Sequence, residues 1–308
     1  MISLTKAIKN RIKKNESLFF AVKELWNVWL NLCSKFTTDE RFVEKQYYNR
    51  TGKKLDLINP RLYNEKVQYT KLYYRDERLK KMVDKFEVRE YVANTIGEQY
   101  LTHIYGVYDS VNEINFDELP ERFVLKLTNG SGYNFICKNK TEKNIKLIKK
   151  RFRHWIKIKH HLLGREWAYK DVPNRIICEE YLETDEEAGL KDYKVFCFSG
   201  VPKLIQVDWD RFTNHKRNLY TPEWDFIDEK VAYENDKSTN IKKPSNLEEM
   251  LECACKLSKG FPHVRVDFYS FDDRLIFGEM TFYHGSGYLK FYNPDFETQM
   301  GDWWELSK

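Results

Sequence analysis

The sequence contains little cysteine, glycine or proline. Its 308 residues include 6 Cys, 13 Gly and 8 Pro. The cysteines form no C-x-x-C pair and most lie in apolar runs, which argues against a disulfide framework or a thiolate metal site. The scarcity of Gly and Pro, beside 16% aromatic residues, argues against a collagen-like or disordered chain. We therefore expect a folded protein with buried thiols, located in the reducing cytoplasm.

The sequence also lacks a large excess of either charge. It has 52 Lys and Arg against 47 Asp and Glu, a net charge of +5. A chain that coats nucleic acid carries a stronger basic excess, and the basic residues here belong to no known nucleic-acid reading module. We expect no nucleic-acid partner.

No apolar run is long enough to span a bilayer. The first of four expected regions, residues 1–35, is a basic amphipathic helical segment. Between Leu18 and Leu32 its apolar positions surround a polar stripe of Lys23, Asn27 and Asn31. Two interpretations stay open. The segment lies on the anionic inner face of the plasma membrane as a peripheral anchor, or it packs on its own domain.

The rest of the chain reads as α+β. A helical region is expected over residues 36–115, followed by short β-branched and aromatic runs with turn residues between them. We divide these runs into a small subdomain, 116–184, and a large subdomain, 185–308. One basic helix, from Glu142 to about Leu163, is expected to interrupt the strands.

The run VLKLTNGSG, residues 124–132, predicts a phosphate site. Strand alternation projects Lys126 from one face just before a turn of Asn129, Gly130, Ser131 and Gly132. The small residues let backbone N–H groups approach an anion, and the lysine adds a point charge. An ordinary hairpin turn is the alternative.

The run VRVDFYSFDDRLIFGEMTF, residues 264–282, predicts a magnesium site. If a three-residue loop, 272–274, pairs Phe271 with Leu275, then Asp267 lies opposite Glu279 and Arg265 lies opposite Thr281. Facing carboxylates repel unless a cation bridges them, and oxygen ligands suit Mg²⁺. The alternative is a solvated polar face balanced by Arg265.

A third run, RIICEEYLE, ends a strand in Glu179 and Glu180 and resembles a hinge for a purine, although this signal is weak by itself. The order of lysine strand, glycine turn, hinge, Asp192-x-Lys194, R-x-D and G-E-x-T resembles the ATP-grasp superfamily. That resemblance implies two α+β subdomains that grip ATP, preceded here by the N-terminal helical region.

Comparison with D-alanine:D-alanine ligases implies roles for individual residues. Lys126 and the glycine turn would cover the phosphates, Glu179, Glu180, Tyr181 and Leu182 would form the adenine hinge, and Asp192 with Lys194 would bind the ribose side. Asp267 and Glu279 would hold Mg²⁺, while Arg265 and Lys126 would be catalytic. The sequence departs from these ligases at Arg89, which replaces a phosphate-binding lysine, and at Thr281, which replaces a metal-binding asparagine and leaves the number of metal ions open.

A closer resemblance covers nearly everything after residue 58, including VDKFEVREYV, FVLKLTNGSG, DRFTNHKRN and FGEMTFYHGSG. These runs are similar to the ATP-grasp family named for teichuronopeptide biosynthesis, found in bacterial capsule and surface-polysaccharide clusters. It implies an ADP-forming carboxylate–amine ligase that uses ATP and Mg²⁺. The reaction joins an amino acid to a uronic-acid carboxylate through an acyl phosphate, on an acidic sugar or polysaccharide precursor.

Substrate contacts are expected from two further groups: Thr281 with Gly285, Ser286 and Gly287, and the cationic stretch of Arg211, His215, Lys216 and Arg217. An exposed loop is the alternative for the cationic stretch. Three other functions stay open: a kinase on the same fold, a glycosyltransferase using the D-x-D of Asp208 and Asp210, and a membrane-associated scaffold.

Overall fold

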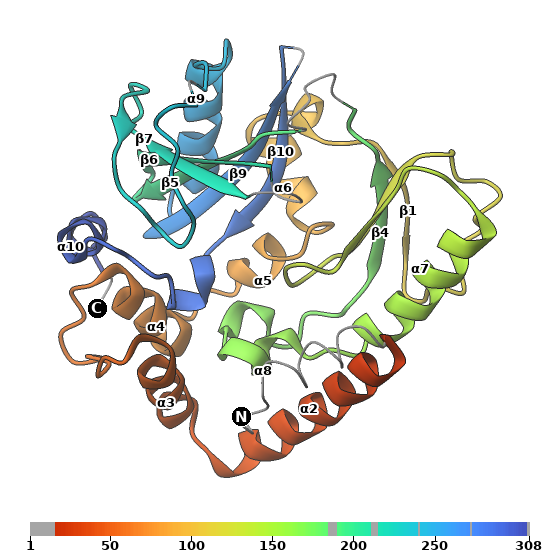
Figure 1. The fold of residues 1–308 in the computed structure, drawn as a ribbon, viewed down its shortest axis with the longest axis horizontal. Helices are drawn as coiled ribbons and strands as arrows, with labels where there is room; N and C mark the ends of the chain where they lie inside the picture. The colour runs from red at the N-terminus through yellow and green to blue at the C-terminus, as the bar shows by residue number, and fades with distance from the viewer. Residues whose placement is uncertain (1–15, 184–189, 211–214, 240, 272, 307–308) are drawn as a thin grey trace.

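The structure, a computed structural model, describes residues 16–306 except 184–189, 211–214, 240 and 272. Two antiparallel sheets stand side by side, with the short helices α5 (Arg78–Met82) and α6 (Val88–Thr95) between them (Figure 1). The four-stranded sheet has the order β1-β4-β2-β3 and the six-stranded sheet the order β10-β9-β5-β6-β7-β8. The mixture of helices and antiparallel strands confirms the expected α+β class.

The four-stranded sheet is formed by β1 (Ile104–Tyr108), β2 (Phe123–Leu127), β3 (Asn134–Cys137) and β4 (Ile176–Glu180). Its apolar face, with Leu125 and Cys178, packs on Ile148 and Phe152 of α7 (Glu142–Trp155). The other face carries Lys126 and Glu179, because successive strand residues point to opposite sides. β1 precedes residue 116, so this sheet begins before the expected boundary.

The basic helix is shorter than predicted. α7 ends at Trp155 and a separate short helix, α8 (His160–Gly164), follows. The side-chain amide of Asn174 donates to the carbonyls of Ile156 and Ile158, and so satisfies backbone acceptors after the end of α7. The prediction of one helix to Leu163 was wrong because sequence periodicity does not reveal a cap supplied from so far along the chain.

The six-stranded sheet holds most of the core. Its strands are β5 (Asp192–Phe198), β6 (Val201–Trp209), β7 (Lys216–Tyr220), β8 (Phe226–Ile227), β9 (His263–Phe271) and β10 (Arg274–Thr281). One face, with Val195, Val264 and Val266, is covered by α9 (Leu247–Ser258). The opposite face is polar at the end that turns toward the four-stranded sheet.

β7 was not among the strands expected from the sequence, and it begins inside the cationic stretch. The strand forms because Leu219 and Tyr220 are buried and Arg217 pairs across the sheet with Asp208. The alternative of an exposed loop for the cationic stretch therefore fails from Lys216 onward.

The N-terminal part is helical, with α2 (Glu16–Phe36), α3 (Asp39–Thr51) and α4 (Tyr63–Tyr73). α4 packs on α10 (Pro294–Asp302) and on η3 (His284–Gly287) at the end of β10. The short segments η1 (Glu98–Tyr100) and η2 (Trp167–Tyr169) complete the described elements. No helix among the described residues has the length and hydropathy needed to cross a membrane.

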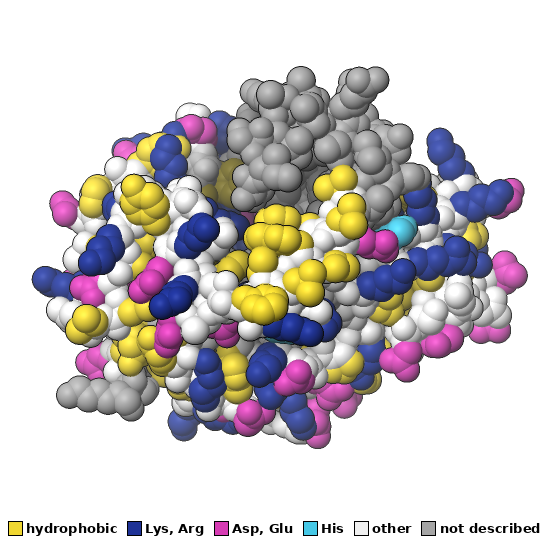
Figure 2. All heavy atoms as spheres, turned by 90° about the horizontal axis from the view of Figure 1, so that it is seen from below, with side chains coloured by type: hydrophobic (Ala, Val, Ile, Leu, Met, Phe, Trp, Pro, Cys, Tyr) yellow, Lys and Arg dark blue, Asp and Glu magenta, His cyan; other side chains and the backbone are white. Residues whose placement is uncertain are grey.

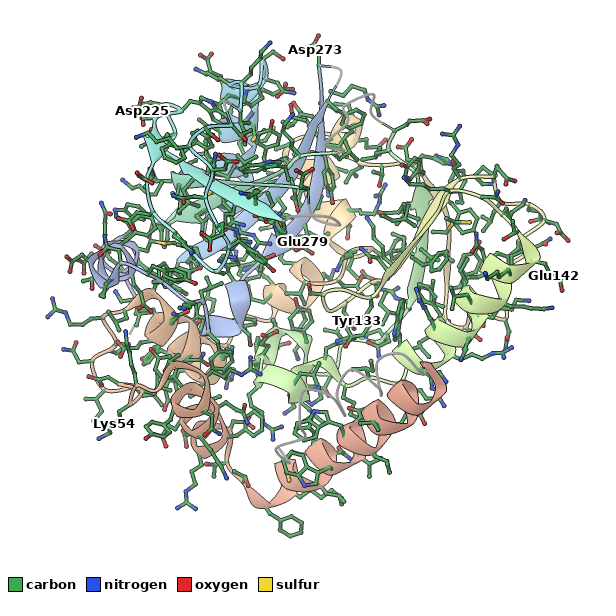
Figure 3. All side chains as sticks on the ribbon, in the orientation of Figure 1. Lys54, Tyr133, Glu142, Asp225, Asp273 and Glu279 are labelled. Atoms are coloured by element: carbon green, nitrogen blue, oxygen red, sulfur yellow. The ribbon has the colours of Figure 1, made fainter. Side chains whose placement is uncertain are left out.

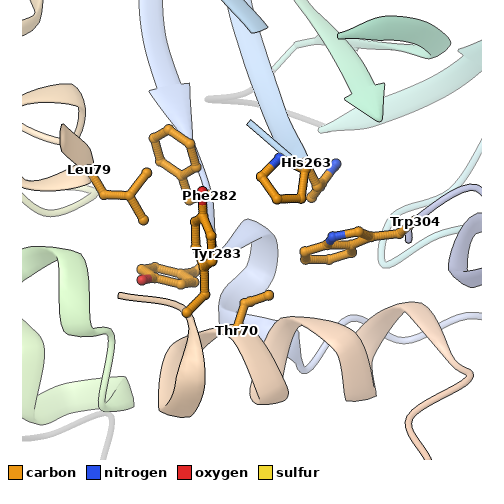
Figure 4. Close-up of a pocket in the computed structure, with 8 residues that line it drawn as sticks. Thr70, Leu79, His263, Phe282, Tyr283 and Trp304 are labelled. Atoms are coloured by element: carbon orange, nitrogen blue, oxygen red, sulfur yellow. The ribbon is translucent and has the colours of Figure 1, made fainter. Parts of the chain in front are cut away.

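Figure 4 shows where α4 meets the end of the β9–β10 hairpin. Thr70, His263, Tyr283 and Trp304 surround a gap of about 10 Å³. A gap of this size is at the lower limit for a single water molecule. It is therefore a packing defect of the core rather than a substrate pocket.

Candidate active site

Asp267 and Glu279 lie opposite each other, as predicted, but the strand register that brings them together differs from the predicted one. The hairpin turn has two residues rather than three, because Phe271 pairs with Arg274. A bulge at Gly278 then shifts the register, so that Glu279 pairs with Asp267 and Thr281 with Arg265. Each of the two differences moves the register by one residue, and together they restore the expected facing. Figure 3 places Glu279 on the side of the hairpin that faces the four-stranded sheet and Asp273 at the hairpin's far end.

Arg265 is the centre of this carboxylate pair. Its Nε and Nη2 donate to the two oxygens of Asp267, both at 2.6 Å, and Nη2 lies 3.3 Å from Oε1 of Glu279. The same Nη2 donates to the hydroxyl of Thr281 at 3.1 Å, and this hydroxyl in turn donates to Glu279. The four residues predicted from the two runs thus form one hydrogen-bonded group on one face of the sheet.

The charged face continues across the neighbouring strands. Lys194 of β5 contacts Asp192, and its Nζ lies 3.5 Å from Asp208 and 3.7 Å from Asp267. All of these side chains are buried. The predicted ribose-side residues therefore lie in the same charged layer as the predicted metal ligands.

The surroundings shift the pKa values of the acids in different directions. Burial raises the pKa of Asp267 to about 6, although Arg265 and Lys194 oppose this rise. Burial also acts to raise the pKa of Glu279, but Lys85, Arg265 and Lys194 outweigh it and bring the pKa to about 2. Two neighbouring carboxylates with pKa values pushed apart are typical of functional sites.

On the four-stranded sheet, Lys126 faces the hinge. Its Nζ lies 2.5 Å from Oε2 of Glu179, a carboxylate that also accepts a hydrogen bond from Thr102. Burial acts to raise the pKa of Glu179, but Lys126 and Arg89 outweigh it and lower the pKa. The structure thus brings the strand lysine and the first hinge residue together.

The glycine turn is fixed by hydrogen bonds at Asn129 and is exposed to solvent at Ser131 and Gly132. The side-chain amide of the buried Asn129 donates to the carbonyls of Val172 and Pro173. Gly130 and Gly132 have φ values of +77° and +81°, which glycine adopts without strain. Ser131 and Gly132 are exposed, so they lie where backbone donors can reach an anion.

Lys85, which precedes α6, was missed by the sequence interpretation. Its backbone N–H donates to the carbonyl of Thr128, and its Nζ donates to the carbonyl of Gly130 at 2.9 Å. The same Nζ lies 3.6 Å from Glu279. One side chain therefore joins the glycine turn of one sheet to the carboxylates of the other. The signal was present, because Lys85 belongs to the quoted run VDKFEVREYV.

Arg89, one helical turn later, lies at the hinge instead. Its guanidinium donates to the carbonyl of Thr102 at 2.6 Å and lies 3.8 Å from Glu179. Arg89 and Glu180 line a pocket of about 530 Å³ together with Leu101, Thr102 and Ile104. Tyr181 and Leu182, the other expected hinge residues, are half-buried beyond the end of β4.

The expected substrate loop Gly285–Gly287 is fixed by α4. Gln68 donates to the carbonyls of Ser286 and Gly287, and Lys71 donates to the carbonyl and the hydroxyl of Ser286. The three loop residues have φ values between +54° and +66°. The carbonyls of Ser286 and Gly287 are thereby turned toward α4, and that of Gly285 accepts from the backbone N–H of Tyr288.

α8 connects the two loops. The ring of His160 packs so closely on Gly130 that a Cβ at this glycine would lie 2.4 Å from Nδ1. Gly164, at the end of α8, lies against the hydroxyl of Ser286, which would be 2.6 Å from a Cβ there. The glycine turn and the substrate loop are thus held on the same five-residue helix.

The described members of the predicted cationic substrate group each lie against a carboxylate. Nε and Nη2 of the buried Arg217 donate to Asp208 at 2.7 and 3.1 Å, and Nε2 of His215 lies 3.3 Å from the same carboxylate. Nζ of Lys216 lies 3.7 Å from Asp236. Arg211 lies outside the described residues.

The donor set fits a magnesium ion. Asp267 and Glu279 are adjacent hard oxygen ligands, and two cations, Lys85 and Arg265, already lie against them. Among the described residues there is no group of three or more His, Cys, Asp or Glu side chains that could form a complete metal site. An ion here would take its remaining ligands from phosphates and water, as Mg²⁺ commonly does.

The fold and this site define an ATP-grasp protein. The chain belongs to the TupA-like ATPgrasp family, whose model matches residues 65–305. This match confirms the ATP-grasp family that the sequence resembles and the ATP-grasp fold that it predicts. No curated protein matches the chain.

Solved structures with a similar fold include ligases. D-alanine–D-alanine ligase from Bacillus anthracis matches with 16% identity and a TM-score of 0.40, covering 65% of this chain and 57% of that one. The Helicobacter pylori ligase has 16% identity and a TM-score of 0.41, covering 77% and 67%. N5-carboxyaminoimidazole synthetase from Staphylococcus aureus, complexed with ADP, has 14% identity and a TM-score of 0.44, covering 76% and 55%.

This chain spans little more than half the length of the B. anthracis ligase. The matches also include the B. anthracis ligase complexed with ATP and the ATP-grasp ligase PsnB complexed with a precursor variant, Mg and ADP.

Proposed function

We propose that the protein is an ATP-dependent carboxylate–amine ligase. It joins the amine of an amino acid to the carboxylate of a uronic acid, in an acidic sugar or precursor of a bacterial surface polysaccharide, and releases ADP and phosphate. The observation that carries the proposal is the position of Lys85, which contacts Gly130 of the glycine turn and Glu279 of the carboxylate pair. A triphosphate placed between the two sheets would meet both groups.

The side chains of the site support this chemistry. Lys126 and Lys85 offer ammonium groups to the phosphates, and Gly130–Gly132 would cover them with backbone donors. Mg²⁺ held by Asp267 and Glu279 would neutralise charge on the β- and γ-phosphates. Arg265 is placed to stabilise charge on the phosphoryl group during transfer, because its guanidinium lies among these carboxylates.

The reaction proceeds in two balanced steps. A substrate carboxylate oxygen attacks the γ-phosphorus, and the bond from this phosphorus to the bridging oxygen breaks. ADP departs, and the substrate becomes an acyl phosphate. The amine nitrogen then attacks the acyl carbon, phosphate leaves, and the nitrogen loses a proton. The loop Gly285–Gly287, with Thr281, is the proposed acceptor contact, and Glu179–Leu182, Asp192 and Lys194 the proposed nucleoside contacts, with Arg89 beside them.

The location is part of the same proposal. Residues 1–35 would hold the enzyme at the inner face of the plasma membrane, close to lipid-linked polysaccharide precursors. Residues 1–15 of this segment lie outside the described residues.

An acceptor screen tests the function. The protein is incubated with ATP, Mg²⁺, single amino acids and uronic-acid acceptors, and the products are identified by mass spectrometry. We expect an amide together with equal amounts of ADP and phosphate. AMP and pyrophosphate as the nucleotide products would refute the mechanism, and a phosphorylated product would instead identify a kinase.

The glycosyltransferase alternative rests on the D-x-D of Asp208 and Asp210. Both oxygens of Asp208 are bound by Arg217, and the nearby cations hold the pKa of this carboxyl far below its usual range despite its burial. Asp208 therefore serves as a buried ion-pair partner, which supports the ligase proposal over this alternative.

A further inference from the structure

The helix α2 exposes its apolar side to solvent. Leu25 is 70% exposed, Val28 58% and Phe36 86%. Trp29 and Leu32 are also about half exposed. Positions 22, 25, 29, 32 and 36 share one side of a helix, because they recur at three- and four-residue intervals. We call the exposed side chains of Val22, Leu25, Val28, Trp29, Leu32 and Phe36 the apolar ridge.

Asn27 and Asn31 of the polar stripe face the protein. Nδ2 of Asn27 donates to the carbonyl of Lys157, and Lys159 donates to Oδ1 of Asn31. Glu24 accepts a hydrogen bond from His154 and lies 3.5 Å from Lys157. A helix that packs on its own domain normally buries its apolar side. Here only part of the apolar side is covered: among the described α2 side chains Leu30 alone is fully buried, and Trp26 packs beside it, while the apolar ridge stays exposed.

The sequence of the segment that carries the ridge is basic. Residues 1–35 contain seven Lys or Arg and two Glu, a surplus as large as the net charge of +5 of the whole chain. Lys157 and Lys159 flank α2 from the end of α7, with the Lys157 side chain 64% exposed. Figure 2 looks onto the side along which α2 runs in Figure 1, and shows hydrophobic side chains gathered with Lys and Arg side chains beside them.

We propose that the apolar ridge of α2 is a docking surface for an anionic lipid bilayer. The ridge would enter the boundary between headgroups and acyl chains, and the basic residues would contact the phosphates and carboxylates of the headgroups. Trp29 of the ridge stacks on the partly buried Trp26, with 4.6 Å between ring centroids, and an indole held in this way is suited to the boundary. A neutral or basic surface would leave the basic surplus without a partner.

The docking surface is linked to the site through α8. α2 packs on α8, where Leu162 shares a core cluster with Leu30. The same helix carries His160 against the glycine turn and Gly164 against the substrate loop. A bilayer under α2 would therefore lie on the helix that supports both loops, which suits an acceptor carried by a lipid.

This inference deepens the membrane location given under the proposed function, and it rests on that proposal for the identity of the acceptor. Vesicle binding is therefore measured without ATP, so that its result is separate from ligase activity. The full-length chain is sedimented with vesicles of phosphatidylcholine alone or mixed with phosphatidylserine, at low and high salt. The test variant is Leu25→Ser with Leu32→Ser. The matched control is Ile58→Ser with Val201→Ser, which changes exposed aliphatic residues away from α2.

We expect the wild-type chain and the control to sediment with the anionic vesicles, and less so at high salt. The test variant should bind at least about tenfold more weakly, because two apolar side chains no longer enter the bilayer. Its ATP binding, measured by calorimetry, should be unchanged. Equal binding of the test variant and the wild type would overturn the proposal, since another segment would then cover the ridge. Light scattering gives the oligomeric state. If the wild type forms a dimer that the test variant does not form, and neither protein binds vesicles, the ridge is instead the contact between two copies of this chain, and the proposal is overturned.

Discussion

The side chain of Lys85 connects the two sheets. Its backbone and side chain hold the glycine turn at Thr128 and Gly130, and its ammonium group lies 3.6 Å from Glu279. A cation in this position neutralises a carboxylate that would otherwise repel a triphosphate. In the proposed complex the same ammonium group would contact the phosphates.

Replacement of Lys85 tests this role. We expect Lys85→Met to weaken ATP binding by about tenfold or more, because a hydrogen bond to a charged group contributes roughly 1.5–3 kcal/mol. Calorimetry with ATP and Mg²⁺ measures the change. Lys138→Met, a cation beyond the end of β3 that lies over the ring of Tyr181, serves as a comparison with a smaller effect. Equal affinities of the Lys85 variant and the wild type would contradict the assignment.

Lys71 gives a test based on pH. This lysine is 1% exposed, and burial lowers its pKa from 10.5 to about 7. Between these two values the unfolded chain binds a proton that the native protein has released. The free energy of unfolding therefore rises with pH above 7, by at most about 1.4 kcal/mol per pH unit.

The variant Lys71→Met lacks this titrating group. Urea unfolding of wild type and variant at pH 7, 8 and 9 should give a difference in stability that grows with pH. If the two stabilities change in parallel over this range, the lysine is not titrating as described.

At the scale of elements, the β9–β10 hairpin shows what the sequence could and could not predict. Strand alternation correctly placed Arg265 and Asp267 on one face, and Glu279 and Thr281 on one face of the next strand. The turn length was wrong, and the bulge at Gly278 was not foreseen. A bulge depends on local backbone geometry, which a two-residue hydrophobic period does not encode.

Other elements also show which features the sequence could predict and which it could not. The strands with strong alternation were predicted correctly, but β7 was not, because its Arg217 and Asn218 become buried only through partners on β6 and in the following loop. α2 was recognised as amphipathic, yet its orientation could not be predicted. Amphipathicity gives two faces and does not say which one the protein covers.

The bulge itself can be tested. A Cβ at Gly278 would lie 3.1 Å from the carbonyl oxygen of Asp267, so Gly278→Ala should displace the carboxylate pair by a few tenths of an ångström. We expect Mg²⁺-dependent ATP binding to weaken by roughly tenfold, since such sites depend on geometry.

The matched variant is Gly200→Ala, in the β5–β6 turn. This glycine has a φ of +82° and only Lys259 Cα near a Cβ, at 3.7 Å. The substitution should lower stability by about 1 kcal/mol through backbone strain and leave ATP binding unchanged. If both variants weaken ATP binding equally, the bulge has no special role in the site.

For the whole molecule, the central claim is that nucleotide and metal are held between the two sheets. Lys126 and the glycine turn come from one sheet, Asp267 and Glu279 from the other, and α5, α6 and α8 hold the sheets in this arrangement. Neither sheet carries both the phosphate-binding residues and the metal-binding carboxylates. On this account, ATP binding requires both subdomains.

Calorimetric titration of ATP into the wild-type protein and into Lys126→Met and Asp267→Asn, with and without Mg²⁺, tests this claim most directly. The account predicts one ATP per chain in the wild type, tighter with Mg²⁺. Lys126→Met should lower the affinity in both conditions, and Asp267→Asn should remove the effect of Mg²⁺. Wild-type protein that binds no ATP, or variants from both sheets that bind it as the wild type does, would contradict the account.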